Sequence, residues 1–592
     1  MRYALALLFL LAFTVARAQN TGEITARELR EYGSFLASDS LKGRKPGTKE
    51  MEVAAQYILR HFISAGLKPI ASEGLQPFEV VTGVTAGASN TLRVNGTAEE
   101  LNQTFIPLVF SSSGTVNAPV VFVGYGFSID ADSLKWNDYN GVDVKGKWVM
   151  IFRGDPEPDD PASRFIPFSE VRSKVLTAKD NGAAGVLLVT PSGFENKDKL
   201  MPLASENNES TAGIPVINIR RDLASRIMSG AGFTTDSLEN MMARNKRPMS
   251  LEAPVVVEAT VDITLEKEMT ANVVAVLEGA DTLLKDEYIV VGAHYDHLGY
   301  GGPESGSRMP DTVAIHPGAD DNASGTAMIM ALAGKLATDL PRPRRSILFV
   351  AFSAEETGLI GSKYFISHCP VDPKRIKAMF NFDMTGRFDP EKNSISVSGT
   401  GTSPEADSIL KIYEKNLSFG VVHSPDGYGP SDHAAFYAAS IPVFFFTTGV
   451  HTDYHTPFDR PEKLDYLTEQ KIGDFAASVI RDIANSPKTL TFKESGSRDQ
   501  AGRGGRRMKV TLGILPDFAG TEKRGLRVDG VTKEGPADRG GILKGDIITS
   551  VNGLSVGNIY DYMARLSKLK RGMTVNVEVM RNGKNEILLI QL

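Results

Sequence analysis

The chain has 592 residues, and 42% of them are hydrophobic. A chain of this length is too long for one hydrophobic core, so we expect roughly two to four domains. Its net charge of −6, from 65 basic and 71 acidic residues, argues against a nucleic-acid or anionic-membrane partner. Cys369 is the only cysteine, so the fold cannot rely on an internal disulfide.

Residues 1–18 have the composition of a secretory signal. Arg2 precedes an apolar stretch over residues 4–15, and the small residues Ala16 and Ala18 follow on either side of Arg17. About a dozen apolar residues are too few to span roughly 30 Å of hydrocarbon as a helix. No later stretch is long and apolar enough to do so. We therefore expect an exported protein, periplasmic or secreted after cleavage near Ala18, without a membrane span.

The next part of the chain predicts a packing helix and then an inserted β-rich module. Apolar residues recur at helical spacing over residues 50–65, without a candidate site. Between residues 107 and 257, short apolar runs alternate with Gly, Pro and Asp, which is typical of strands and turns. Only one helix is predicted there, over residues 169–181. We expect this insert to have its own small core and a structural, lid or substrate-shaping role.

From residue 272 the chain alternates between predicted strands and helices. The strands are expected at 288–293, 346–352, 379–383 and 442–447, with helices that include 324–338 and 361–367. Such alternation is typical of an α/β fold, in which helices cover both faces of a mostly parallel, mixed sheet.

The C-terminal part of the chain is predicted to be a separate unit. Residues 491–508 are rich in Gly and Arg without periodicity and are expected to be a linker. Residues 509–592 combine short strands with one helix over 559–569.

Histidine and carboxylate side chains stand where the predicted strands end. Glu355 and Glu356, for example, follow the central strand directly. The other groups at strand ends or in the loops that follow them are His294, Asp296, Asp320, Asp321, Asp383, His451 and His455. Because parallel strands bring their carboxyl ends to one edge of a sheet, we expect these side chains to converge there.

This set of side chains has the chemistry of a metal centre. Imidazoles and carboxylates without a thiolate suit Zn²⁺, with Mn²⁺ or Co²⁺ as substitutes. The carboxylates outnumber the needs of one ion, which indicates two ions roughly 3.5–4 Å apart. Asp296 is placed to accept a hydrogen bond from the ring N–H of His294, on the nitrogen that does not bind the metal. One of the two adjacent glutamates would bind metal, and its neighbour would act as a base.

The motifs at these positions resemble those of a known family. They read GAHYDH, PGADDNASG, SAEETGLIGS, FNFDMTG, PSDHAAF and YHTPFD, and they are similar to the zinc-dependent exopeptidases of metallopeptidase family twenty-eight, which includes bacterial aminopeptidases. The resemblance implies that the metal ligands are His294, Asp321, Glu356, Asp383 and His455. It also implies that Asp321 bridges two zinc ions, that Glu355 is the general base, that Asp296 supports His294, and that a cis peptide joins Asp321 to Asn322.

Two further resemblances concern the other domains. The insert looks like a protease-associated (PA) domain through GYGF and DYNGVDVKGKWVMIFRGD. The C-terminal unit is similar to PDZ domains, which implies that Leu512, Gly513 and Ile514 form a loop for the C-terminal carboxylate of a peptide or protein partner. The expected domains are a signal peptide at 1–18, a zinc peptidase domain at 19–106 and 258–490, the insert at 107–257, a linker at 491–508 and the PDZ-like domain at 509–592.

The expected reaction is hydrolysis of the N-terminal bond of a peptide. Glu355 would accept a proton from the attacking water and return it to the leaving amine. Candidates for substrate binding are Ser431, Asp432, His433 and Tyr454, with Tyr454 as an oxyanion donor.

Three alternatives remain open at this point. Glutaminyl cyclases share this fold and related motifs but use one zinc ion, so metal stoichiometry separates a cyclase-like acyltransferase from a di-zinc peptidase. Carboxypeptidase or dipeptidase action within the same family is the second alternative. The third is a non-catalytic peptide-binding receptor, against which the complete set of ligands and the intact Glu355 argue.

Overall fold

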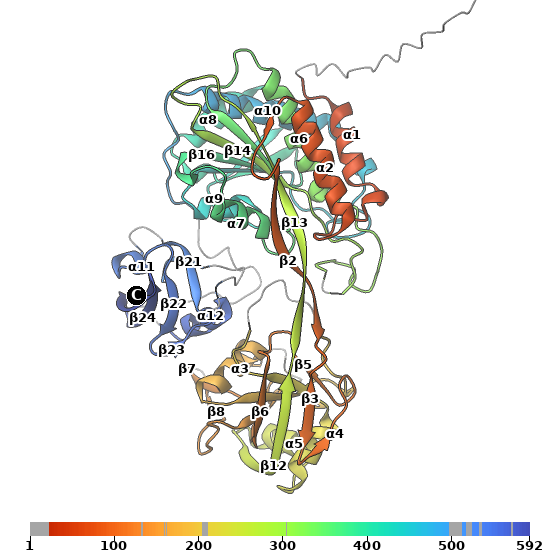
Figure 1. Cartoon of the computed structure of the whole chain (residues 1–592), viewed down its shortest axis with the longest axis vertical. Coiled ribbons are helices and arrows are strands. Elements are labelled where there is room, and N and C mark those ends of the chain that lie inside the picture. Colours follow the sequence, from red (N-terminus) through yellow and green to blue (C-terminus); the bar gives the residue numbers. More distant parts are fainter. Residues whose placement is uncertain are drawn as a thin grey trace, which may run out of the picture.

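The computed structural model describes residues 23–592 except 132–133, 159, 161–162, 204–210, 304, 496–511, 517–521, 523, 532–534 and 570–571. The predicted signal at 1–18 and most of the predicted linker lie outside the described residues. The described chain forms three bodies, of which two are joined by a long two-stranded ribbon and the third lies beside them (Figure 1). No helix in the described part of the chain has the length and apolar character needed to cross a membrane.

The first body is a mixed sheet between two layers of helices (Figure 1). Its strand order is β1-β13-β15-β14-β16-β19-β17-β18, and the four strands from β15 to β19 run parallel. The bounds of these strands are β1 Lys68–Pro69, β13 Ile263–Leu277, β14 Tyr288–His294, β15 Ser346–Phe352, β16 Ile376–Phe382, β17 Ser394–Ser398, β18 Gly420–Ser424 and β19 Val443–Thr447. This arrangement confirms the predicted α/β fold with a mostly parallel mixed sheet.

Burial on both faces explains the long apolar runs of the central strands. All residues of β15 are buried, and successive side chains point to opposite faces. Ile347 and Phe349 pack against one helical layer, whereas Leu348 and Val350 pack against the other. The first layer contains α1 Ala26–Leu36, α2 Lys49–Ser64, α6 Gly325–Thr338, α8 Ala406–Tyr413 and α10 Tyr466–Asn485, and the second contains α7 Ile360–Ser367 and α9 His433–Ala438.

The second body is the β-rich insert, whose sheet has the order β4-β3-β12-β6-β9-β10-β11-β5. Its elements are β3 Thr91–Val94, β4 Thr97–Ala98, β5 Phe105–Pro107, β6 Gly114–Val123, β7 Ser128–Ala131, β8 Leu134–Asn137, β9 Trp148–Phe152, α3 Val171–Asp180, β10 Gly185–Val189, β11 Val216–Ile219, α4 Arg221–Ser229, α5 Thr235–Asn245 and β12 Ser250–Val261.

Two predictions about the insert need correction. Strands β3 to β5 pair within its sheet, and β12 continues to Val261, so residues 91–106 and 258–261 belong to the insert and not to the peptidase domain as predicted. The insert also contains α4 and α5 besides the single predicted helix. Their buried side chains, such as Leu223 and Leu238, face the core of the insert, but both helices are short and largely polar, which hid their periodicity in the sequence.

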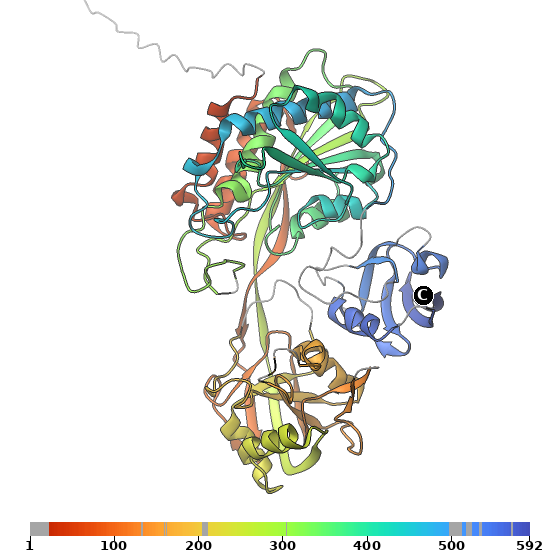
Figure 2. The ribbon, with the colours of Figure 1, turned by 180° about the vertical axis from the view of Figure 1, so that it is seen from behind.

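A two-stranded antiparallel ribbon joins the first two bodies (Figure 2). It consists of β2 Leu75–Ala86 and the first part of β13, which pair from Leu75 with Val273 to Ala86 with Ile263. Further along, Val273–Leu277 of β13 pair with β15, so the ribbon continues directly into the first sheet. The insert is therefore held at the end of a strand that also belongs to the first sheet.

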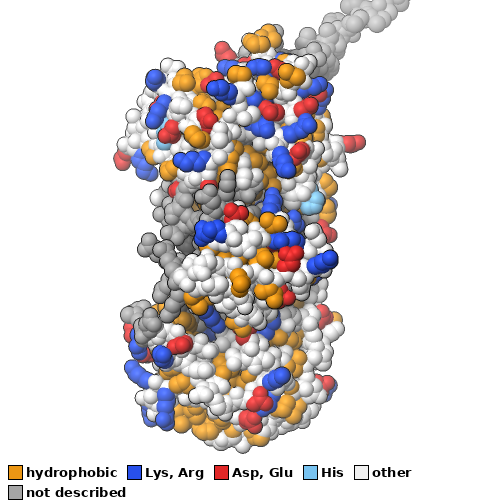
Figure 3. Space-filling view, turned by 90° about the vertical axis from the view of Figure 1, so that its left-hand side faces the viewer, with side chains coloured by type: hydrophobic (Ala, Val, Ile, Leu, Met, Phe, Trp, Pro, Cys, Tyr) orange, Lys and Arg blue, Asp and Glu red, His pale blue; other side chains and the backbone are white. Residues whose placement is uncertain are grey.

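The third body is the C-terminal unit, with the strand order β20-β21-β22-β24-β25 and β23 paired to β22. Its elements are β20 Ile514–Pro516, β21 Leu526–Val531, α11 Pro536–Arg539, β22 Ile547–Val551, β23 Leu554–Ser555, α12 Ile559–Ser567, β24 Thr574–Arg581 and β25 Lys584–Gln591. It contacts the insert where Arg565 of α12 pairs with Asp180. Acidic and basic side chains are interspersed over the face shown in Figure 3, in keeping with the modest net charge of −6.

Candidate metal centre

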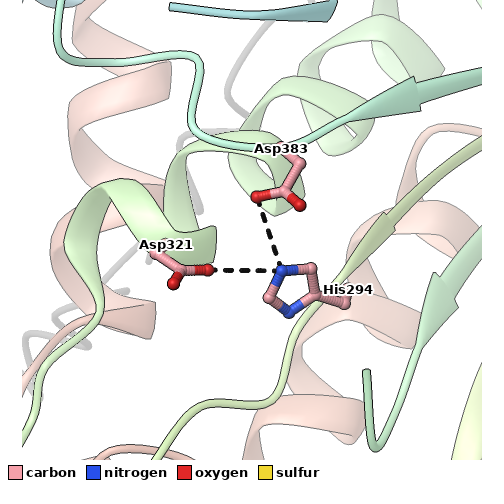
Figure 4. Close-up of side chains that lie close together, drawn as sticks. All are labelled: His294, Asp321 and Asp383. Atoms are coloured by element: carbon pink, nitrogen blue, oxygen red, sulfur yellow. Dashed lines mark ion pairs between the residues drawn. The ribbon is translucent and has the colours of Figure 1, made fainter. Parts of the chain in front are cut away.

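The first group of candidate ligands surrounds His294 (Figure 4). The His294 Nε2 atom, at the end of β14, lies 3.3 Å from Asp321 Oδ1 and 3.5 Å from Asp383 Oδ1. Asp321 comes from the loop before α6, and Asp383 follows β16. Three segments that are far apart in the sequence therefore place their side chains together at the carboxyl edge of the sheet, as the strand ends predict.

The second group lies on the other side of Asp321. The His455 Nε2 atom is 3.0 Å from Asp321 Oδ2 and 3.1 Å from Glu356 Oε2. Each oxygen of the Asp321 carboxylate thus faces a different imidazole. The structure brings all five predicted ligands together as two groups that share one carboxylate.

The tautomers of the two imidazoles test whether this cluster suits a cation. His455 Nδ1 is 2.9 Å from the carbonyl oxygen of Gly306, and His294 Nδ1 is 3.3 Å from that of Asp296. A carbonyl can only accept, so each Nδ1 carries the proton and each neutral imidazole turns its Nε2 lone pair toward carboxylate oxygens. Lone pairs facing carboxylates at such distances need a cation or a second proton between them. Nitrogen and oxygen ligands in this arrangement fit zinc.

The electrostatic field at the cluster supports the same conclusion. Burial would lower the pKa of His455, but its contacts with Asp321 and Glu356 outweigh burial and raise that pKa to about 11. For Asp321, burial would raise the pKa, but the neighbouring His294 and His455 hold it well below its usual value. A site that binds an extra proton so strongly also attracts a divalent cation.

His297 approaches the second group as well, and the prediction did not include it. Its Nδ1 atom lies 2.7 Å from Glu356 Oε1 but 3.9 Å from Asp321 Oδ2. The shorter distance is that of an N–H donated to a carboxylate. His297, Asp321 and Glu356 offer ligand atoms close enough to hold a metal ion, and the short contact of His297 also orients the Glu356 carboxylate. The second histidine of the GAHYDH motif was the sequence signal for this role.

Asp296 is buried beside His294, but its carboxylate has different partners from those predicted. Its oxygens accept hydrogen bonds from the backbone N–H groups of Glu355, at 3.1 Å, and Glu356, at 3.3 Å. The distance from His294 Nδ1 to Asp296 Oδ1 is 3.7 Å, which is too long for a hydrogen bond. Asp296 therefore links the histidine-bearing loop to the segment that carries both glutamates.

Glu355 lies beside the cluster and has a raised pKa. Burial, followed by the nearby carboxylates of Glu356 and Asp432, raises the pKa of Glu355 well above its ordinary value, although the charge of His294 opposes the shift. A carboxylate with a raised pKa is a better proton acceptor near neutral pH, which is the property that a general base needs.

The loop before α6 is held by a second set of carboxylates. Asp459 Oδ2 accepts the backbone N–H groups of Asp320, at 2.9 Å, and Asp321, at 3.1 Å. His451 Nε2 lies 3.3 Å from Asp320 Oδ2, while its Nδ1 accepts the N–H of Asp453. His451 Nε2 therefore faces Asp320, away from the two groups around Asp321. The peptide bond between Asp321 and Asn322 is cis, in agreement with the expectation.

Two of the four predicted substrate-binding residues, Tyr454 and Asp432, have strongly shifted pKa values. Tyr454 stacks on the His455 ring at 3.8 Å, and burial followed by the charges of Asp321 and Glu356 raises the pKa of its phenol, so it stays a hydrogen-bond donor. Asp432 is buried, and burial raises its pKa to about 7.

Ser431 and His433 have packing partners instead. The Ser431 hydroxyl accepts a hydrogen bond from Asn381 at 2.8 Å, and the His433 ring stacks on Phe445 at 4.5 Å. Both side chains have 0% exposure. Their predicted role in substrate binding is not supported by these contacts.

The predicted carboxylate-binding loop of the C-terminal unit lies next to an open strand. The Leu512 carbonyl accepts the N–H of Ala537 at 2.7 Å, Gly513 has a positive φ of 80°, and Ile514 begins β20. Among the described strands, β20 is at the edge of its sheet. An edge strand of this kind has backbone groups free to pair with an added peptide.

Three parts of the chain match known domain families. Residues 272–480 match peptidase family M28, residues 116–227 match the PA domain, and residues 509–592 match the PDZ domain. The three domain types predicted from the sequence are thereby confirmed.

The chain is also similar to individual proteins. It is 25% identical over 388 residues to aminopeptidase YwaD of Bacillus subtilis (strain 168), which covers 64% of this chain and 70% of the relative. It is 34% identical over 140 residues to leupeptin-inactivating enzyme 1 of Streptomyces exfoliatus, which covers 24% and 31%. Among solved structures, an aminopeptidase from Aneurinibacillus sp. strain AM-1 gives a TM-score of 0.48 at 22% identity, covering 80% of this chain and 96% of that one. BSAP, a zinc aminopeptidase from Bacillus subtilis, gives 0.46 at 21% identity, covering 77% and 95%.

Proposed function

Because the chain contains a peptidase family M28 domain, we propose that it is an exported di-zinc aminopeptidase that removes residues from the N-terminus of peptides. The observation that carries the proposal is the position of Asp321, whose two oxygens face His294 on one side and His455 on the other. A carboxylate shared in this way is the arrangement that two ions about 3.5–4 Å apart require.

The five ligands divide naturally between the two ions. His294, Asp321 and Asp383 would hold one zinc, and Asp321, Glu356 and His455 the other. Zinc bound there would polarise the carbonyl of the scissile bond and lower the pKa of a coordinated water. His297 and Asp296 keep Glu356 in place through its carboxylate and its backbone N–H.

Glu355 is the proton carrier in the proposed reaction. Its carboxylate accepts a proton from the attacking water and later returns it to the amine that leaves. The raised pKa of Glu355 favours acceptance, and bound cations would draw the pKa back toward neutrality, where release is also easy. Tyr454, with a protonated phenol beside His455, is placed to donate to the oxyanion of the tetrahedral intermediate.

The other domains have supporting roles in the proposal. The edge strand β20 and the loop at Leu512, Gly513 and Ile514 support binding of an extended peptide or protein C-terminus. The PA domain would shape access to the metal centre. The composition of residues 1–18 supports export, and N-terminal sequencing of the mature protein should begin near Gln19.

A set of matched peptides tests the function. We expect stepwise release of residues from a peptide with a free N-terminus, no release when the N-terminus is acetylated, and no effect of amidating the C-terminus. A chelator should abolish release, and added zinc should restore it.

Other results would favour the alternatives. Release from the C-terminus would identify a carboxypeptidase, and cleavage of dipeptides alone a dipeptidase. Cyclisation of an N-terminal glutamine would identify a cyclase-like acyltransferase. Peptide binding that is insensitive to chelator, without cleavage, would identify a receptor.

A further inference from the structure

A buried arginine lies beneath the metal centre, in the segment that connects α1 and α2. Arg44 stands between α1 and α2 and is 1% exposed. Its guanidinium donates four hydrogen bonds, all to backbone carbonyls. The acceptors are Leu36 at 2.7 Å, Tyr295 at 2.8 Å, Pro317 at 2.6 Å and Gly318 at 2.9 Å.

Three of these carbonyls belong to the loops that carry metal ligands. Tyr295 lies between His294 and Asp296, and Gly318 lies three residues before Asp321. A single planar group therefore joins the loop after β14 to the loop before α6. The guanidinium fork is rigid, so the two loops are held at a defined separation.

The backbone around Arg44 adds to this connection. The N–H of His297 donates to the Arg44 carbonyl at 3.2 Å, and the N–H of Gly299 donates to the Gly43 carbonyl at 3.0 Å. Gly43 has a positive φ of 73°, and a Cβ there would lie 2.5 Å from the carbonyl oxygens of Gly299 and His316. Only glycine permits this close approach.

The charge of Arg44 does not by itself favour metal binding. Burial lowers the pKa of Arg44 to about 10, and the charges of Asp296 and Asp321 oppose that shift, so the side chain is a cation near neutral pH. A fixed cation close to the centre repels zinc. Any gain in zinc affinity from Arg44 must therefore come from the geometry that it imposes.

We propose that Arg44 is a positioning residue for the zinc centre, which sets the separation of His294 and Asp321 by tying together the loops that carry them. The inference rests on the proposed zinc centre and extends it to the N-terminal helical segment. It assigns the Gly43–Arg44 turn, which connects α1 and α2, to the site.

The decisive variant is Arg44→Lys, which keeps the charge but loses the fork. Arg44→Met removes the charge as well. Arg345 provides a matched control, because it is also 1% exposed, donates to Glu287 and to the Ile483 carbonyl, and precedes β15 at the opposite edge of the sheet. Arg345→Lys and Arg345→Met should destabilise the zinc-free fold without affecting the site.

Zinc affinity is measured by competition with a chelator, and the stability of the zinc-free protein by thermal unfolding. We expect both Arg44 variants to bind zinc at least about 10-fold more weakly than the wild type. The zinc affinity of the Arg345 variants should stay within about 2-fold of the wild type, although their zinc-free forms lose a comparable amount of melting temperature. Should Arg44→Met fail to fold, Arg44→Lys carries the test.

Two results would overturn the inference. One is wild-type zinc affinity in Arg44→Lys, and the other is tighter zinc binding in Arg44→Met, which would mean that only the charge matters. Failure of the proposed zinc centre itself would be distinct, because the wild-type chain would then bind no zinc.

Discussion

At the scale of single residues, two adjacent glutamates have different surroundings. Glu356 is held from both sides, with His297 at 2.7 Å from Oε1 and His455 at 3.1 Å from Oε2. Among the described residues, the Glu355 carboxylate has no such contact, although it lies in the same field of charges. These surroundings fit the proposed roles, in which Glu356 holds a metal and Glu355 moves a proton.

This difference predicts opposite effects of the same substitution. Glu355→Gln should keep zinc affinity close to the wild type but lower turnover by roughly 100- to 10,000-fold, because the proton acceptor is lost. Glu356→Gln should weaken zinc binding, since an amide is a poorer ligand than a carboxylate. Chelator competition and turnover of an aminoacyl substrate measure the two effects. Equal loss of zinc in the two variants would contradict the assignment.

His433 gives a prediction about stability and pH. Burial lowers its pKa from 6.5 to about 3. Between these values the unfolded chain binds a proton on this imidazole and the folded chain does not, so its contribution to stability is complete above pH 6.5 and is lost as the pH falls toward 3.

His433→Phe keeps a ring against Phe445 and removes this titration. In denaturant unfolding of the zinc-free proteins, the free energy of unfolding should therefore fall less steeply on acidification in the variant than in the wild type. The other titrating groups are common to both proteins and cancel in the comparison. Parallel curves would show that His433 does not carry the acid sensitivity.

At the scale of secondary structure, the central strands were predictable because each is buried on both faces. The apolar run from Ser346 to Phe352 is the whole of β15, and the carboxylates that follow it lie at the predicted edge. His294 ends β14 and Asp383 follows β16 directly, so topology brings these two ligands to one edge of the sheet. Asp321 and His455 come from longer loops. The roles of Arg44 and Asp459 could not be predicted in this way, because their side chains bind backbone carbonyls and amides. Every residue offers such backbone groups, so no sequence motif marks the partners.

The first residue of α6, Gly325, packs closely against the end of β16. A Cβ on Gly325 would lie 2.2 Å from the carbonyl oxygen of Phe382, at the end of the strand that leads to Asp383. Gly325→Ala should therefore cost roughly 1–3 kcal/mol of stability and weaken zinc binding, because α6 must move away from β16.

Gly33 in α1 is the matched control. A Cβ there would have its nearest neighbours at 3.8 Å, on the ring of Tyr466. Gly33→Ala should stabilise the protein by about 0.5–1 kcal/mol, because alanine loses less backbone entropy in a helix. Thermal unfolding with and without zinc measures both variants. Equal changes in the two would contradict the close packing of α6 on β16.

At the scale of the whole molecule, the ribbon of β2 and β13 carries the insert (Figure 2). The C-terminal unit contacts the insert from the side. Arg565 is 2% exposed and pairs through two nitrogens with Asp180 at the end of α3. Nearby, Asn558 donates to the Thr211 carbonyl at 3.0 Å. The PDZ unit is therefore docked on the PA domain and not merely tethered to it.

Breaking the buried ion pair should release the PDZ unit. Arg565→Ala leaves Asp180 unpaired, at a cost of roughly 3 kcal/mol for the docked state, so small-angle scattering should show a larger radius of gyration. Turnover of a small aminoacyl substrate should not change, because the metal centre lies in another domain. Arg581→Ala is the control, since Arg581 pairs with Asp546 inside the PDZ unit. An unchanged radius in Arg565→Ala would show that other contacts hold the unit.

The measurement that tests the central claim most directly is the number of zinc ions bound per folded chain at saturation. The wild type should bind two, Asp383→Asn and His455→Ala should each bind one, and Asp321→Asn should bind neither tightly, because both ions share its carboxylate. One zinc ion in the wild type, or full occupancy of either site in Asp321→Asn, would contradict the account.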